Sequence, residues 1–231
     1  MIYRLIRLLI AVPVLRTLLR PRVLGLANVP KTGPVILAAN HLSLLDPVLL
    51  SAIVKRPISY VVKSEYFTAP GMSGRAQAAF FRALHQVPVD RSGGDAADPA
   101  LRTAEVLLAR GEAFGIFPEG TRSPDGLLHR GRTGVARIAL ATGAPVIPVG
   151  LIGTAQVMSP GSLRVRGGRP EVHFGAPLLF GSVVVPTGEP DAEPGRVRAV
   201  TDQVMAAIAE LSGQHRFETD TDTDTDTRDP G

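Results

Sequence analysis

Short apolar segments that alternate with helical segments constrain the fold of this chain more than any other feature. Residues 34–39 read PVILAA, an uninterrupted apolar run of strand length, and a helical pattern follows it. A strand that is apolar on both faces is typical of a parallel sheet covered on both sides. We therefore expect an α/β fold in which a mostly parallel, mixed sheet is covered by helices on both faces.

The same alternation continues along most of the 231 residues. It predicts strands at residues 34–39, 58–62, 86–89, 113–117, 145–149, 163–166 and 171–174, and helices at residues 43–54, 97–110, 134–142 and 196–211. A further helical stretch runs from the second strand to about residue 84, and residues 118–132 form a loop. We expect a catalytic domain at residues 27–190 and a closing helix at residues 191–213.

Residues 1–26 differ from the rest of the chain because they combine five arginines with aliphatic side chains and no acidic residue. Their longest uncharged apolar run, residues 8–15, is interrupted by Pro13 and falls short of the about 20 residues that a spanning helix needs. Two short helices broken near Pro13 would suit a membrane interface. The alternative is a helix packed on the core with its arginines directed outward.

Charge separates the body of the chain from its end. Six acidic residues and one arginine follow Phe217, so residues 1–217 carry 24 basic and 15 acidic side chains. A basic body suits an anionic partner, which could be a membrane surface, a phosphorylated substrate or nucleic acid. Residues 214–231, which include a Thr-Asp repeat, are expected to be a disordered acidic tail.

The amino-acid composition also excludes several kinds of site. There is no cysteine, which rules out a disulfide scaffold, a thiol nucleophile and a thiolate zinc site. The five histidines show no metal-ligand spacing, so we expect no metal.

A histidine and an aspartate follow the first apolar strand, in the segment NHLSLLD at residues 40–46. Ligands of α/β sheets lie at the ends of strands, and a carboxylate beside one ring nitrogen of His41 would leave the other nitrogen free to accept a proton. Asp46 is the candidate carboxylate. The alternative is local, because Ser43 could cap the following helix while Asp46 completes a capping box.

His85 and Asp90 have the same spacing, but the residues between them read as a strand. Positions five apart in a strand point to opposite faces, so this second pair is not expected to meet.

A third polar cluster, FPEGTRS at residues 117–123, follows another apolar strand. The Pro-Glu-Gly turn presents Glu119 and Arg122 from a defined backbone, and the guanidinium of Arg122 suits a phosphate. The alternative is an ion pair of Arg122 with Glu119 or Asp125 that stabilises the loop. Residues 144–150 are apolar and could only form a wall of a site.

Taken in order, four segments resemble the glycerolipid acyltransferase family, of which bacterial 1-acylglycerol-3-phosphate acyltransferases are typical. Residues 40–46 resemble its His-x4-Asp motif, residues 87–91 (VPVDR) its second motif, residues 117–123 its third, and residues 146–149 (VIPV) its fourth. The resemblance covers roughly residues 28–175. Two departures, Leu84-His85 and Gly131-Arg132, fall where the choice of acceptor could be set.

The resemblance implies that His41 and Asp46 are catalytic. It also implies that a set of residues near the strand ends binds the acceptor phosphate, namely Lys63, Arg91, Glu119, Gly120, Thr121 and Arg122. The acyl donor would be acyl-CoA or acyl carrier protein, with no metal or redox cofactor. The expected partners are a membrane lipid surface and a lysophosphatidic acid-type acceptor rather than nucleic acid, at the cytoplasmic face of the plasma membrane.

The reaction implied by this resemblance is direct acyl transfer to the free hydroxyl of 1-acylglycerol-3-phosphate, which gives phosphatidic acid in phospholipid biosynthesis. His41, held by Asp46, would remove the proton of that hydroxyl as it attacks the acyl thioester. Two alternatives stay open: an acyltransferase for another lyso-lipid, such as an amino-acid lipid, and a peripheral lipid-binding protein without turnover.

Overall fold

The fold is built around one seven-stranded sheet. A computed structural model describes residues 19–68, 70–72, 74–75, 78–79, 86–89, 98–159, 164–181 and 194–217. The strands are β1 (Arg22–Leu24), β2 (Val35–Ala39), β3 (Ile58–Lys63), β4 (Gln86–Val89), β5 (Ala113–Ile116), β6 (Val146–Ile152) and β7 (Glu171–Phe174), in the order β1-β7-β6-β2-β5-β3-β4. All neighbours pair in parallel except β6 and β7, which are antiparallel.

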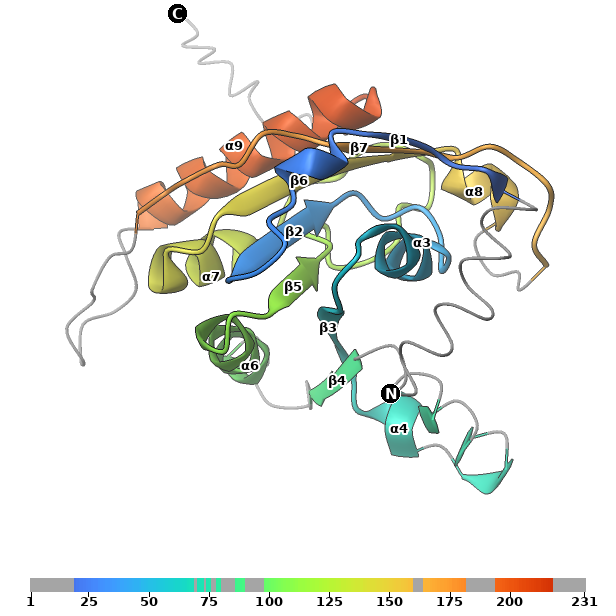
Figure 1. The fold of residues 1–231 in the computed structure, drawn as a ribbon, viewed down its shortest axis with the longest axis horizontal. Helices are drawn as coiled ribbons and strands as arrows, with labels where there is room; N and C mark the ends of the chain where they lie inside the picture. The colour runs from blue at the N-terminus through green and yellow to red at the C-terminus, as the bar shows by residue number, and fades with distance from the viewer. Residues whose placement is uncertain are drawn as a thin grey trace, which may run out of the picture.

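The expected mixed sheet is confirmed, and it is covered on both faces. The longer helices are α3 (Asp46–Ile53), α6 (Asp98–Ala109), α7 (Gly134–Thr142) and α9 (Pro194–Ser212); the shorter ones are η3 (Leu26–Asn28), α4 (Glu65–Thr68) and α8 (Thr154–Val157). Figure 1 shows α6, α7 and α9 on one side of the sheet and α3 on the other.

The central strand β2 explains this arrangement, because all five of its residues are buried. Its odd-numbered side chains, from Val35 to Ala39, pack with α3 and α8, while Ile36 and Ala38 pack with α6, α7 and α9. Successive side chains of a strand point to opposite faces, so a strand between two helical layers must be apolar throughout. The apolar run that predicted this strand therefore reflects its central place.

The order in which strands are added to the sheet changes sides at β2. From β2 it runs outward to β3 and β4, returns to insert β5 beside β2, and then crosses to β6 on the other side of β2. The carboxyl ends of β2 and β5 meet at this reversal, where open α/β sheets bind their ligands. Ala38 pairs in register with Ile116, so residues 41 and 119 each follow a paired position by three residues.

Helix α9 packs on β6 at very close range. A side chain on Gly150 of β6 would lie 2.5 Å from the carbonyl carbon of Leu211, so only glycine permits the contact. Along the helix, Val204, Met205 and Ile208 are buried in the same core as β2 and α7. The closing helix expected at residues 191–213 is thus part of the central core.

Both predicted ends of the chain need correction. Residues 22–24, expected to lie in interfacial helices, form the edge strand β1, which pairs with β7. The preceding residues 1–18 lie outside the described residues. Residues 214–217, expected to be disordered tail, contact the segments that follow β2 and β5, where Gln214 bonds Asn40 and the backbone of Leu128 exchanges hydrogen bonds with His215 and Phe217.

Two predicted elements differ locally. The first helix begins at Asp46 instead of residue 43, because Pro47 has no N–H to donate and is tolerated only in the first turn. The strand expected at residues 163–166 is wrong, since residues 164–166 form no strand and all three side chains are exposed. Without a face to bury, alternation alone does not create a strand. Among the helices that the structure describes, none has the length and hydrophobicity needed to cross a membrane.

Candidate active site

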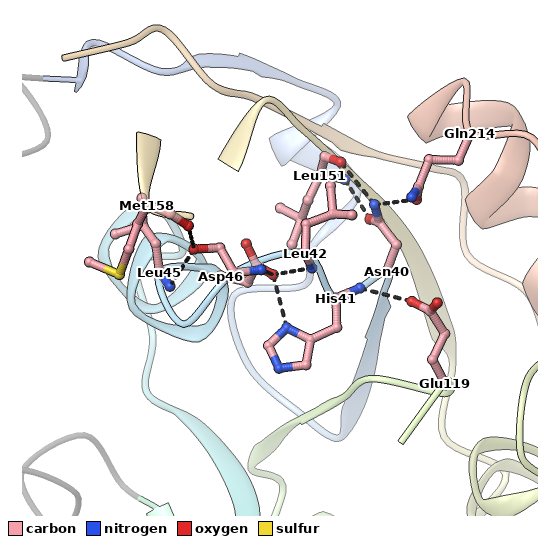
Figure 2. Close-up of polar contacts among 10 residues, drawn as sticks. Asn40, His41, Leu42, Leu45, Asp46, Glu119, Leu151, Met158 and Gln214 are labelled. Atoms are coloured by element: carbon pink, nitrogen blue, oxygen red, sulfur yellow. Dashed lines mark hydrogen bonds and ion pairs between the residues drawn. The ribbon is translucent and has the colours of Figure 1, made fainter. Parts of the chain in front are cut away.

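His41 and Asp46 meet directly after β2. Nδ1 of the His41 ring lies 2.9 Å from Oδ2 of Asp46, whose side chain is fully buried. An ionised carboxylate can only accept, so Nδ1 would donate to it, and the neutral ring would then present the lone pair of Nε2. Figure 2 shows Nε2 turned away from Asp46, and no described residue forms a hydrogen bond with it. This arrangement leaves one ring nitrogen available to a substrate.

The carboxylate of Asp46 also orders the turn before α3. Its Oδ2 accepts hydrogen bonds from the backbone N–H groups of Leu42 and Ser43, each at 2.7 Å. Oγ of Ser43 accepts a hydrogen bond from the N–H of Leu45 at 3.2 Å, and its hydroxyl donates to the carbonyl of Met158. The contacts that the local alternative predicted are therefore present in the turn before α3, and Asp46 serves this turn as well as His41.

An aromatic stack fixes the plane of the histidine ring. His41 stacks on Phe117, with ring centroids 4.0 Å apart and 17° between the planes. Phe117 in turn lies parallel to Tyr60 of β3, with centroids 5.8 Å apart. The ring is thus held by a face contact and an edge hydrogen bond, which leaves it little freedom to rotate.

The loop after β5 is tied to the backbone of His41. Oε1 of Glu119 accepts a hydrogen bond from the His41 N–H at 3.0 Å, and its Oε2 accepts from the N–H of His129 at 3.0 Å. The N–H of Ser123 donates to the His41 carbonyl at 2.8 Å. Burial raises the pKa of the Glu119 carboxyl, and the two backbone N–H groups act in the opposite direction. Oε1 of Glu119 therefore joins the loop after β5 to the loop after β2, and its Oε2 closes the loop after β5 on itself.

Arg122 lies next to this junction, since the following residue, Ser123, contacts His41. Its side chain is half-buried, while Gly120 and Thr121 are exposed. Among the described residues, no ion pair joins Arg122 to Glu119 or Asp125, and Asp125 is occupied by His129 at 2.9 Å. The loop-stabilising alternative for Arg122 has no contact to support it. Gly120 has φ 75° and lies against the side chain of Arg132.

Of the two remaining predicted anion ligands, Lys63 and Arg91, the structure describes only the backbone of Lys63. Lys63 ends β3 and pairs in register with Val89 of β4, so it stands at the edge of the sheet where β2 and β5 also end. Arg91, two residues beyond β4, lies outside the described residues, as do His85 and Asp90 of the rejected pair. In the described part of the chain, no group of three or more His, Asp or Glu side chains is arranged to hold a metal ion.

Sequence reasoning missed several residues that support the site. Asn40 is fully buried, and its side chain bonds both the N–H and the carbonyl of Leu151 on β6. Gln214, placed in the predicted tail, bonds Asn40 from the end of α9. The position of Asn40 beside His41 offered a signal; Gln214 offered only its place one residue after a helix-ending glycine, Gly213.

Known proteins are similar to this chain in sequence. A family model described as Acyltransferase matches residues 20–152. The 1-acyl-sn-glycerol-3-phosphate acyltransferase of Bacillus subtilis is 28% identical over 190 residues, which are 81% of this chain and 85% of that protein. The chloroplastic enzyme of that name from Brassica napus is 33% identical over 139 residues, which are 60% of this chain. The chain spans only 39% of that relative and 37% of its Arabidopsis thaliana counterpart.

A solved structure agrees with the fold. The 1-acyl-sn-glycerophosphate acyltransferase PlsC of Thermotoga maritima is 29% identical, with a TM-score of 0.59 over 85% of this chain and 75% of that one. The family match begins just before β1 and ends with β6, so it contains His41, Asp46 and the loop that Glu119 fastens to them. With more than half of its length matched, this chain belongs to the acyltransferase family.

Proposed function

We propose that this chain is an O-acyltransferase that moves a fatty acyl group from a thioester to the free hydroxyl of 1-acyl-sn-glycerol-3-phosphate. The observation that carries the proposal is the pairing of His41 with buried Asp46 beside the loop that contains Arg122. The names of the relatives from Bacillus subtilis and Thermotoga maritima support this acceptor. Phosphatidic acid would be the product.

In the proposed step, Nε2 of His41 takes the proton of the acceptor hydroxyl as its oxygen attacks the thioester carbonyl carbon. The carbon–sulfur bond then breaks, and the thiol leaves with a proton returned by the imidazolium. Asp46 stabilises the imidazolium that forms between these two transfers. One positioned base contributes about 10² to 10⁴-fold, so the orientation of both substrates must provide much of the remaining acceleration.

The acceptor phosphate would lie against Arg122, with Lys63 and Arg91 approaching from the ends of β3 and β4. A guanidinium binds a phosphate through two parallel hydrogen bonds, which fixes the orientation of the acceptor as well as its position. Since Ser123 bonds His41, an acceptor held by Arg122 is held relative to the base. Glu119, Gly120 and Thr121 would shape this loop.

Acyl-CoA or acyl carrier protein is the proposed donor, and the chemistry between a thioester and an alcohol requires no redox cofactor. Residues 1–18, which contain three arginines and precede β1, are the proposed contact with an anionic lipid surface, at the cytoplasmic face of the membrane.

A head-group panel tests the proposal. Purified protein is given lysophosphatidic acid, other lysophospholipids and lyso-amino-acid lipids, each with acyl-CoA and with acyl carrier protein. Fastest transfer to lysophosphatidic acid, lost in His41→Ala and kept in His85→Ala, is the expected result. A preference for another acceptor would assign that substrate instead, and lipid binding without transfer would identify a non-catalytic protein.

A further inference from the structure

The chain after α9 turns back toward the catalytic loops. The helix ends at Ser212, and Gly213 has φ 67°, a left-handed conformation that ends a helix and is favourable only for glycine. The N–H of Gly213 donates to the carbonyl of Ala209, and the N–H of Gln214 is 3.3 Å from the hydroxyl of Ser212. Together with the close packing of Leu211 on Gly150, this turn aims Gln214 at the end of β2.

Gln214 connects two parts of the site. Its Oε1 accepts a hydrogen bond from Nδ2 of Asn40 at 2.6 Å, and its Nε2 donates to the carbonyl of Gly126 at 2.6 Å. Figure 2 shows the Gln214 side chain reaching from the end of α9 to Asn40, directly beside His41. Asn40 is fully buried and uses its other polar contacts on Leu151. Without Gln214, one buried N–H of Asn40 loses its acceptor.

The next three residues pair with the loop that follows Arg122. The N–H of Leu128 donates to the carbonyl of His215 at 2.9 Å, and the N–H of Phe217 donates to the carbonyl of Leu128 at 3.0 Å. The ring of Phe217 stacks on His129, with centroids 4.9 Å apart. Because the N–H of His129 is bound by Glu119, these contacts continue to the backbone of His41.

We propose that residues 213–217, the C-terminal clasp, hold both catalytic loops in place and that Gln214 is a positioning residue for His41. Gln214 acts through Asn40, while Phe217 and the Leu128 pairing act through the loop of Glu119 and Arg122. The clasp lies outside residues 20–152, to which the family model is matched. The inference rests on the proposed acyl transfer for its kinetic part and on the contacts alone for its structural part.

If the clasp positions both loops, substitutions of Gln214 and Phe217 should change different kinetic constants, which would not happen if the segment only stabilised the fold. Gln214→Ala should lower kcat roughly tenfold, because a buried N–H beside His41 loses its acceptor, and should change the KM for acceptor little. Phe217→Ala should mainly raise the acceptor KM, because it loosens the loop that carries Arg122. If the clasp only stabilised the fold, both variants would melt at a lower temperature and keep wild-type kinetic constants below the melt.

Three further variants sharpen the test in the full-length protein. Gln214→Glu keeps an oxygen that faces Asn40 but has no N–H for Gly126, so kcat should recover to within about threefold of wild type. Gln214→Ala added to Asn40→Ala should cause no further loss of kcat, since the two residues act in series. Gln203→Ala, which replaces an exposed glutamine on α9, is the matched control and should behave as wild type.

Amide hydrogen exchange makes the clasp testable even if the acyl transfer is absent. Gln214→Ala should speed exchange in residues 40–46 and 124–130 and leave α6 unchanged. If wild type transfers no acyl group but these two segments respond, the proposed function fails and the clasp stands. Unchanged exchange in both segments, or additive kinetic losses with Asn40→Ala, would overturn the clasp.

Discussion

Replacing Asp46 with asparagine would test whether its charge serves catalysis or only the turn before α3. Oδ2 of Asp46 accepts hydrogen bonds from His41 and from the N–H groups of Leu42 and Ser43, and an amide oxygen in the same place can accept all three. The amide nitrogen would then take the place of Oδ1, which is buried and has no hydrogen-bond partner among the described residues. The substitution therefore preserves the turn and removes the charge.

The expected magnitude follows from the separation of the two groups. Once His41 gains a proton, its ring would carry a positive charge beside the carboxylate, with the closest atoms 2.9 Å apart and the charge centres farther. Unit charges about 4 Å apart at an effective dielectric constant of about 20 attract by about 4 kcal/mol. Loss of that attraction in the transition state corresponds to a fall in kcat of about 10³-fold. The buried amide N–H₂ should cost about 1–3 kcal/mol in stability.

The assay combines steady-state transfer to lysophosphatidic acid with denaturant unfolding of the same preparation. Glu171→Gln is the matched control, because His173 and Glu171 form a histidine–carboxylate pair with the same 2.9 Å separation on β7, which β6 separates from β2. A kcat for Asp46→Asn within tenfold of wild type, with the protein folded, would refute the electrostatic role. Asp46 would then be a residue that shapes its turn.

Three more predictions concern anion binding, burial and the membrane. Arg122→Lys should raise the acceptor KM roughly tenfold with the donor KM unchanged, because a lysine cannot form two parallel hydrogen bonds with the phosphate. Arg110→Lys, at an exposed position after α6, is the control. A loss of affinity confined to the donor would reassign the site to the donor's phosphates. Because its folded pKa is raised, Glu119 should make the free energy of unfolding fall as pH rises from its ordinary 4.5 to the raised value. Glu119→Gln should lack this fall in denaturant unfolding measured across that range, whereas parallel profiles would contradict the assignment. Deleting residues 1–18, which hold three arginines, should weaken binding to anionic vesicles about 100-fold in a sedimentation assay, at about 1 kcal/mol per arginine; unchanged binding would place the anchor elsewhere.

The central part of the fold was predictable because a strand that is buried on both faces must be apolar throughout, and such an apolar run is visible in the sequence. β2 and β6 are apolar runs with little polar interruption, and α7 was predicted with the boundaries that the structure has. The His41–Asp46 contact was predictable for a related reason: the residues between them form a turn instead of a strand, so the chain can bring the two side chains together.

The edges of the molecule were not predictable by the same reasoning. β1 has three residues with the burial pattern exposed, half-buried, exposed, which leaves almost no periodic signal. It exists because its backbone pairs with β7, 149 residues later in the chain at the Arg22–Glu171 register. Pairing partners so far apart are set by the packing of the whole sheet, which local propensity does not encode.

The contact between the two catalytic loops depends on strand order, which a single sequence does not specify. The segments that contain His41 and Glu119 are far apart in the chain, and either could have faced another strand end. Parallel pairing of β2 with β5 places them side by side, since Ala38 is in register with Ile116 and each loop leaves its strand at the same level. Glu119 then finds the backbone N–H of His41 instead of a substrate phosphate. A carboxylate adjacent to an anion site would oppose binding if it faced the anion. Because Glu119 is used as a buried bridge between the loops, the positive charge of Arg122 stays available to the acceptor phosphate that we propose.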